Sequence, residues 1–138
     1  SSDVCSSDLQ AQRRCCSVPF VPPSAEGRRR LEALVQRMGL TVVQGNRMGH
    51  LLGPDISKGK ALATLKRHLG AEQVKVLALG DSPNDLPLLE VADIAVVVPG
   101  PDGPHPALRS GIDAGRFQLA AAPHANGWDE AVRRILRI

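Results

Sequence analysis

The sequence predicts an α/β fold built around a parallel β-sheet. Residues 74–79 and 94–98 are apolar runs with the length of buried strands, and leucines recur at helical spacing between them. A strand, a helix and a second strand in this order form a right-handed crossover in a parallel sheet. The first run ends at Gly80, and the carboxylates Asp81 and Asp85 follow it. Because such sheets bind ligands where strands end and helices begin, we expect the functional site there.

Composition limits the classes of protein to consider. The 138 residues suffice for one domain with a real core, which must consist of Leu, Val, Ile and Ala because there are two Phe, one Trp and no Tyr. The net charge of +3 is scattered along helix-like segments, so we expect solvated faces, and the few aromatics argue against single-stranded nucleic-acid binding. We expect no metal site or disulfide at the three cysteines. No apolar segment is long enough to cross a bilayer, so the expected location is the cytoplasm.

The front of the chain predicts a leader, a helix and a hairpin. Residues 1–12 lack an initiator Met and a signal-peptide core and nearly repeat themselves, so we expect a non-native leader. Residues 18–21 form a possible edge strand, and a helix is predicted between the N-cap Ser24 and Gly39. Strands over 40–44 and 48–52 would form a hairpin. Since Gly53 and Pro54 then break the chain, we predict one domain over 13–52 and another over 53–138.

The second half alternates between helices and strands. A helix is predicted after the possible cap Ser57, and Gly70 closes it. The predicted strands at 74–79 and 94–98 flank a helix near residue 88, and a proline-rich loop covers 99–106. Residues 107–126 are ambiguous, with weak helical character near 117–122. A last amphipathic helix is expected to carry Asp129 and Glu130 in its first turn, where they would suit the helix dipole.

Two clusters of residues indicate phosphate or metal chemistry. Asp81 and Asp85 have the oxygen ligands that Mg²⁺ prefers, although on spacing alone they are equally well explained as helix caps. Asn84 adds a polar group that a simple cap would not need. Lys58 and Lys60 lie at a helix start, where the dipole disfavours a cation unless an anion compensates it. A phosphoryl group or a carboxylate cluster would be such an anion, and an exposed lysine is the alternative.

Together these clusters resemble two motifs of the haloacid-dehalogenase (HAD) superfamily of phosphatases. Lys58-Gly59 is followed about twenty residues later by Gly-Asp-Ser-Pro-Asn-Asp at residues 80–85. In detail the chain is similar to the mannosyl-3-phosphoglycerate phosphatase family, in residues 44–47, 50–52, 80–98 and 127–128. The resemblance covers about residues 13–138. It implies the C-terminal half of a HAD-like Rossmannoid core with a parallel sheet, preceded by the latter part of an α/β cap.

The resemblance also implies roles for single residues. Asp81 would bind Mg²⁺ directly, and Asp85 would support the metal directly or through water. Lys58 would neutralise the phosphoryl group, and Asn84 would hydrogen-bond near it. Arg47 would contact the anionic end of the substrate, although a surface arginine explains it almost equally well. His50 is expected to pack in a strand, and His105 and His124 to lie exposed in loops.

One part of the family pattern is missing from the sequence. The resembled phosphatases form an aspartyl-phosphate on the first aspartate of an Asp-x-Asp motif, and this chain has no such motif. We therefore expect a C-terminal fragment that is inactive alone. The expected function is Mg²⁺-dependent hydrolysis of a glycosyl-3-phosphoglycerate, a small anionic phosphorylated sugar acid, with no nucleic-acid or membrane partner. The alternatives are a broader sugar-phosphate phosphatase and a non-catalytic phosphate- or metal-binding module.

Overall fold

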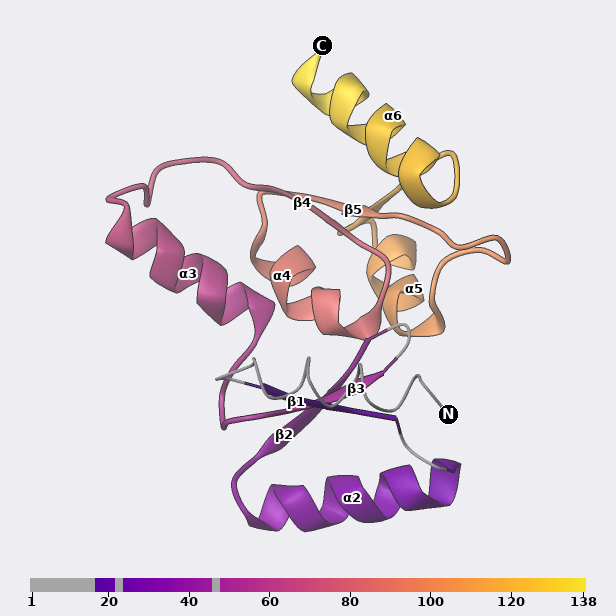
Figure 1. The fold of residues 1–138 in the computed structure, drawn as a ribbon. Helices are drawn as coiled ribbons and strands as arrows, with labels where there is room; N and C mark the ends of the chain where they lie inside the picture. The colour runs from indigo at the N-terminus through magenta and orange to yellow at the C-terminus, as the bar shows by residue number, and fades with distance from the viewer. Residues whose placement is uncertain (1–16, 22–23, 46–47) are drawn as a thin grey trace, which may run out of the picture. The chain divides into compact units, whose positions relative to one another are not determined.

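The chain divides into two compact units, Ser1–Ile56 and Ser57–Ile138. The computed structural model describes residues 17–21, 24–45 and 48–138 (Figure 1). Each unit has its own sheet and its own helices, and each is described by itself below. The assignment of residues 13–52 to a cap and of 53–138 to a phosphatase core stays a prediction.

The first unit is a three-stranded antiparallel sheet with one described helix. Strands β1 (Ser17–Phe20), β3 (Gly49–Leu52) and β2 (Thr41–Gln44) pair in the order β1-β3-β2. Helix α2 (Ala25–Arg37) begins where the Ser24 side chain accepts a hydrogen bond from Gly27 N at 3.0 Å. It ends before Gly39, whose φ of 69° suits glycine. The predicted helix and hairpin are therefore confirmed, with Asn46 and Arg47 outside the described residues.

The second unit is built on a parallel sheet, which confirms the predicted α/β class. Its strands β4 (Leu77–Gly80), β5 (Ile94–Val97) and β6 (Gln118–Leu119) pair in the order β4-β5-β6, all parallel. Between and around them lie the helical elements α3 (Lys58–His68), η1 (Pro83–Asp85), α4 (Leu86–Val91), α5 (Pro106–Asp113) and α6 (His124–Leu136). The predicted crossover from one parallel strand through a helix to the next is thus present.

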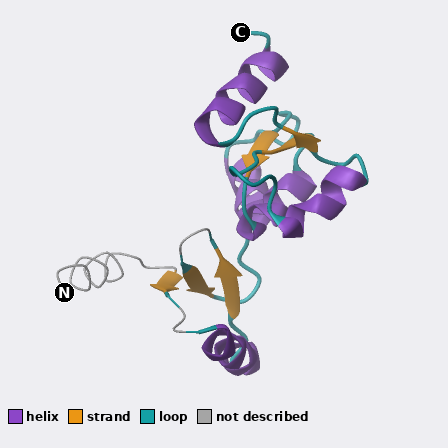
Figure 2. Ribbon diagram, turned by 90° about the vertical axis from the view of Figure 1, so that its right-hand side faces the viewer, coloured by secondary structure: helices purple, strands orange, loops and turns teal. Residues whose placement is uncertain are grey.

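Apolar side chains cover both faces of this sheet. Helices α4 and α5 pack on one face and α6 on the other (Figures 1 and 2). The first core consists of Ala78, Leu89, Ala95, Val97, Leu108 and Phe117. The second core consists of Val96, Val98, Ala120 and Ala131. Since successive residues of a strand point to opposite faces, the unbroken apolar run of β5 fills both cores.

Three details of the second unit differ from the sequence prediction. The first strand begins at Leu77 rather than at residue 74, because its pairing with β5 begins there. Residues 118–119 form strand β6 rather than a helix, since β5 offers an edge with which they pair. Helix α6 begins at His124, so Asp129 lies in its second turn and pairs with Arg133 at 2.9 Å instead of meeting the dipole.

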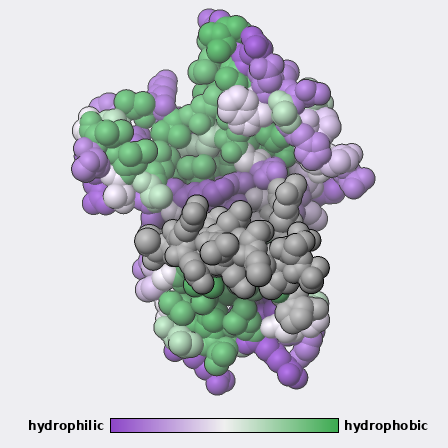
Figure 3. All heavy atoms as spheres, viewed as in Figure 1, coloured by the Kyte–Doolittle hydropathy of each residue, from purple (hydrophilic) through white to green (hydrophobic). Residues whose placement is uncertain are grey.

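Apolar side chains are also exposed on both units, as the face drawn in Figure 3 shows. They include Leu34 of α2, Leu65 of α3 and Leu136 of α6. Because isolated exposed apolar residues are common on protein surfaces, exposure by itself does not locate a functional site here. Among the described residues, no helix has the length and apolar character to cross a membrane.

Candidate active site

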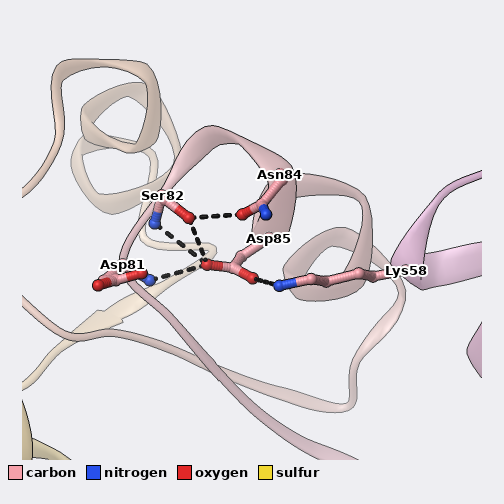
Figure 4. Close-up of polar contacts among 5 residues, drawn as sticks. All are labelled: Lys58, Asp81, Ser82, Asn84 and Asp85. Atoms are coloured by element: carbon pink, nitrogen blue, oxygen red, sulfur yellow. Dashed lines mark hydrogen bonds and ion pairs between the residues drawn. The ribbon is translucent and has the colours of Figure 1, made fainter. Parts of the chain in front are cut away.

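The buried carboxylate of Asp85 is the centre of the candidate site (Figure 4). Its Oδ2 accepts hydrogen bonds from the backbone N–H groups of Asp81 and Ser82, each at 3.1 Å, and from Ser82 Oγ at 3.0 Å. Its Oδ1 is bound by the ammonium group of Lys58, which lies at the start of α3. The predicted pairing of a lysine at a helix start with an anion is therefore observed, and the anion is Asp85.

Two glycines allow the backbone approaches that bring these groups together. A Cβ on Gly80 would lie 2.4 Å from Asp85 Cβ, so a side chain there would displace the carboxylate. A Cβ on Gly59 would lie 2.3 Å from the carbonyl oxygen of Pro87, which lies in α4. The absence of both side chains lets the start of α3 rest on α4 and lets Lys58 reach Asp85.

The surroundings of Asp85 lower the pKa of its carboxyl group. Burial acts in the opposite direction and raises the pKa, because it disfavours the charged form. The hydrogen bond and charge of Lys58, the Asp81 N–H and the Ser82 hydroxyl together outweigh burial. Asp85 is therefore a stable anion at neutral pH, and its negative charge holds Lys58 in place.

A pocket of about 570 Å³ opens beside this cluster. Its lining contains Lys58, Asp81, Ser82, Asn84 and Asp85, together with Leu79, Gly80, Val98, His124, Ala125 and Trp128. The structure thus brings together the predicted residues Lys58, Asp81, Asn84 and Asp85. Arg47 lies outside the described residues, and the roles of all five residues stay predictions.

The oxygen ligands in the pocket suit a magnesium ion that keeps several waters. Asp81 lines the pocket and is exposed. Both oxygens of the Asp85 carboxylate accept hydrogen bonds from protein donors. In the described part of the chain, no three His, Cys, Asp or Glu side chains gather to hold a metal. Mg²⁺ commonly binds through one or two carboxylates, with water and phosphate as its remaining ligands. The few carboxylates of this pocket suit that mode of binding and would not form a site made of protein ligands alone. Asp81 would be the direct ligand, and Asp85 would act through water.

Ser82 is a member of the cluster that the sequence prediction did not single out. It is buried, and its Oγ lies 2.5 Å from Asn84 Oδ1 as well as 3.0 Å from Asp85 Oδ2. A hydroxyl carries one hydrogen, so it donates to one of the two oxygens at a time. Its position in the sequence between Asp81 and Asn84 was the signal that could have identified it.

The two predicted loop histidines have different surroundings. His124 is exposed, as expected, but it begins α6 and lines the pocket. His105 is also exposed and caps α5, where its Nδ1 accepts a hydrogen bond from Ala107 N at 3.1 Å. His50 lies in strand β3, as predicted. The pocket position of His124 depends on where α6 begins, which the sequence pattern placed too late.

Residues 25–99 match the family of haloacid dehalogenase-like hydrolases, and this range is more than half of the chain. The chain belongs to the haloacid dehalogenase-like hydrolases. The match ends just beyond β5, so it includes Lys58 and the acidic turn and leaves out α6.

Curated HAD-like relatives are phosphatases. The chain is 28% identical over 129 residues to the glucosyl-3-phosphoglycerate/mannosyl-3-phosphoglycerate phosphatase of Persephonella marina, a match that covers 91% of this chain and 46% of the relative. It is 39% identical over 87 residues to the phosphoglycolate phosphatase of Methanothermobacter thermautotrophicus, with coverage of 63% of this chain and 36% of the relative. The chain therefore spans less than half the length of either relative.

A solved structure shares the HAD-like fold. The sucrose-phosphatase of Synechocystis, in complex with sucrose and phosphate, superposes with a TM-score of 0.67 at 21% identity, over 97% of this chain and 62% of that chain. This likeness supports the fold alone, and it agrees with the parallel sheet of the second unit.

Proposed function

We propose that this chain carries the metal- and phosphate-binding groups of a Mg²⁺-dependent phosphatase that acts on a glycosyl-3-phosphoglycerate. The main support for this proposal is that one pocket at the end of β4 is lined by Lys58, Asp81, Asn84 and Asp85. An ammonium group and carboxylates in one place suit a phosphate monoester, whose charge needs both a cation and an ordered metal.

The proposal gives each group one task. Asp81 holds the Mg²⁺, which when bound polarises a phosphoryl oxygen. Lys58, which Asp85 orients through Oδ1, neutralises the charge that develops on the phosphoryl group. Asn84 Oδ1 lies against Ser82 Oγ, so the amide nitrogen of Asn84 serves as a donor to phosphate. Arg47 is proposed to bind the glycerate carboxylate, and the unit that contains it is proposed to be part of a cap.

The nucleophile is proposed to come from a polypeptide segment other than these 138 residues, since they contain no Asp-x-Asp motif. An aspartate oxygen would attack phosphorus, and the bond from phosphorus to the leaving oxygen would break to give an aspartyl-phosphate and the alcohol. Water would then release phosphate from that intermediate. The 138 residues alone are therefore proposed to bind Mg²⁺ and phosphate without turnover.

Two observations bear on the substrate. A match that covers 91% of this chain is to a phosphatase named for glucosyl- and mannosyl-3-phosphoglycerate. A second candidate is a smaller phosphorylated hydroxy acid, suggested by the match of 39% identity over 87 residues to a phosphoglycolate phosphatase. Both names describe a phosphate ester of a hydroxy acid, but glycerate is one carbon longer than glycolate and here carries a sugar.

Phosphate release by the product of the complete open reading frame tests the proposal. The substrates are glucosyl-3-phosphoglycerate, phosphoglycolate and a hexose phosphate, each with Mg²⁺ and with EDTA. We expect turnover with Mg²⁺ only, fastest on glucosyl-3-phosphoglycerate, and its loss in Asp81→Ala. The 138 residues alone should release no more phosphate than their Asp81→Ala variant does. Release by these residues alone that exceeds the Asp81→Ala background would contradict the proposed division of the site, and binding without turnover by the complete product would indicate a non-catalytic module.

A further inference from the structure

His124 and Trp128 of α6 form a wall of the same pocket, opposite in chemistry to the acidic turn. We call these two residues the α6 wall. They lie one helical turn apart and so share one face of the helix. Ala131 and Ile135 continue this stripe and pack on the sheet. The α6 wall is therefore the part of the stripe that lines the pocket instead of the core.

The backbone holds the α6 wall in a defined place. His124 N donates a hydrogen bond to Pro99 O at 3.1 Å, and Ala120 N donates to Val97 O at 2.9 Å. A Cβ on Gly127 would lie 1.8 Å from the carbonyl oxygen of Ala122, so the helix start packs directly on the chain that leaves β6. These contacts fix the start of α6 to the carboxyl end of the sheet, where the phosphate-binding groups lie. A preorganised wall of this kind suits recognition.

Two features indicate that the α6 wall meets a ligand. His124 has a φ of 53°, a left-handed conformation that favours glycine, so its side chain is kept at a backbone cost. Trp128 is 52% exposed, although tryptophan is the largest apolar side chain and the chain has one Trp and no Tyr. In the part of the chain that the structure describes, the other exposed large apolar residues, such as Leu136, do not line this pocket.

We infer that the α6 wall determines specificity by binding the sugar ring of the leaving group, an inference that rests on the proposed function. The C–H faces of a pyranose are apolar and bury well against an aromatic ring, so the Trp128 indole would stack on the sugar. The His124 imidazole would hydrogen-bond to a sugar hydroxyl. The phosphate would stay with Lys58 and Asp81, which line the same pocket.

The single tryptophan makes a direct binding test possible. Emission of the 138-residue chain in Mg²⁺ reports on Trp128 alone. The probes are 3-phosphoglycerate and glucosyl-3-phosphoglycerate, which differ only in the sugar, with affinities measured by calorimetry. We expect both to bind and only the glucosylated probe to change the emission. Trp128→Ala should weaken the glucosylated probe about three- to tenfold and leave 3-phosphoglycerate unchanged, and Trp128→Phe should restore most of the loss.

Controls separate the role of the wall from folding and from the proposed function. Leu136→Ala removes an equally exposed apolar side chain from the same helix and should leave both affinities unchanged. His124→Gly should raise the thermal midpoint by relieving the positive φ and still weaken the glucosylated probe. Binding of both probes without a response of Trp128, or equal losses for both in Trp128→Ala, would overturn the inference alone and assign the wall to protein packing. Failure of the unaltered chain to bind either probe would overturn the proposed function and this inference with it.

Discussion

At the scale of the residue, Asp85 connects the groups of the candidate site. One oxygen of its carboxylate binds Lys58, and the other collects three donors from Asp81 and Ser82. Asp85 therefore organises both the turn and Lys58. Its replacement should have consequences for stability even without metal or substrate.

Asp85→Asn should lower the free energy of unfolding by about 2 kcal/mol at pH 7 in EDTA, as measured by urea denaturation. The amide loses the ion pair with Lys58 and brings its own N–H donors against groups that also donate. We place the loss below that of a fully buried ion pair because Lys58 is half-exposed. Asp102→Asn, at an exposed position in a loop, is the matched control and should change stability by less than about 0.5 kcal/mol. Equal effects of the two substitutions would show that Asp85 does not organise the turn.

The difference in stability between the unaltered chain and Asp85→Asn should depend on pH. The native pKa of Asp85 lies below its ordinary value of 3.8, so the unfolded state takes up the proton first as the pH falls. The stability from Asp85 is thus fully present above about pH 5 and is lost as the pH falls through the native pKa. The difference between the unaltered chain and Asp85→Asn should shrink accordingly below about pH 4. A difference that stays constant down to pH 3 would contradict the lowered pKa.

At the scale of the element, the contact between α3 and α4 decides where Lys58 lies. Helix α3 carries Lys58 in its first turn, and Gly59 beside it permits the close approach to Pro87 of α4. The Ser57 side chain caps the same turn by accepting a hydrogen bond from Lys60 N at 3.2 Å. The two residues of this motif therefore have separate tasks: Lys58 supplies a positive charge, and Gly59 permits close packing.

Gly59→Ala tests the packing task because two effects predict opposite signs. Helix propensity alone would stabilise α3 by up to about 1 kcal/mol. The added methyl group would lie 2.3 Å from the Pro87 carbonyl oxygen, and we expect this clash to win, with a net loss of about 1–3 kcal/mol by thermal unfolding. Weaker binding of inorganic phosphate should accompany it, since Lys58 moves with α3. Gly100→Ala meets nothing closer than 3.7 Å and serves as the control. A stabilised Gly59→Ala variant would refute the role of this contact.

At the scale of the whole molecule, metal binding should appear as stability. A ligand that binds only the native state at about 100 times its dissociation constant adds about 2.7 kcal/mol. We expect Mg²⁺ to raise the thermal midpoint of the chain relative to NaCl of equal ionic strength, and EDTA to reverse the rise. Asp81→Ala should abolish the rise, whereas Asp102→Ala should keep it. An unchanged midpoint at millimolar Mg²⁺ would argue against a metal site formed by these residues.

Much of the architecture was predictable because its signals are local in the sequence. Ser24 and Ser57 cap the helices they were expected to cap, and Gly39 and Gly70 have the positive φ expected just past helix ends. The hairpin and the parallel crossover follow in the same way from apolar runs and turn residues. Strand β6 was not predictable, since a two-residue strand exists only where a neighbouring edge accepts it.

The sequence by itself determined the α/β class and the acidic turn after β4, because a strand end, a glycine and clustered charges act over a few residues. Only the tertiary structure decided that Lys58 binds Asp85 across 27 residues, and that His124 and Trp128 complete the same pocket. Those arrangements depend on how closely separate elements can approach. Gly59 allows a close approach to Pro87 of α4, which is distant along the chain, whereas Gly127 allows one to Ala122, which immediately precedes its own helix.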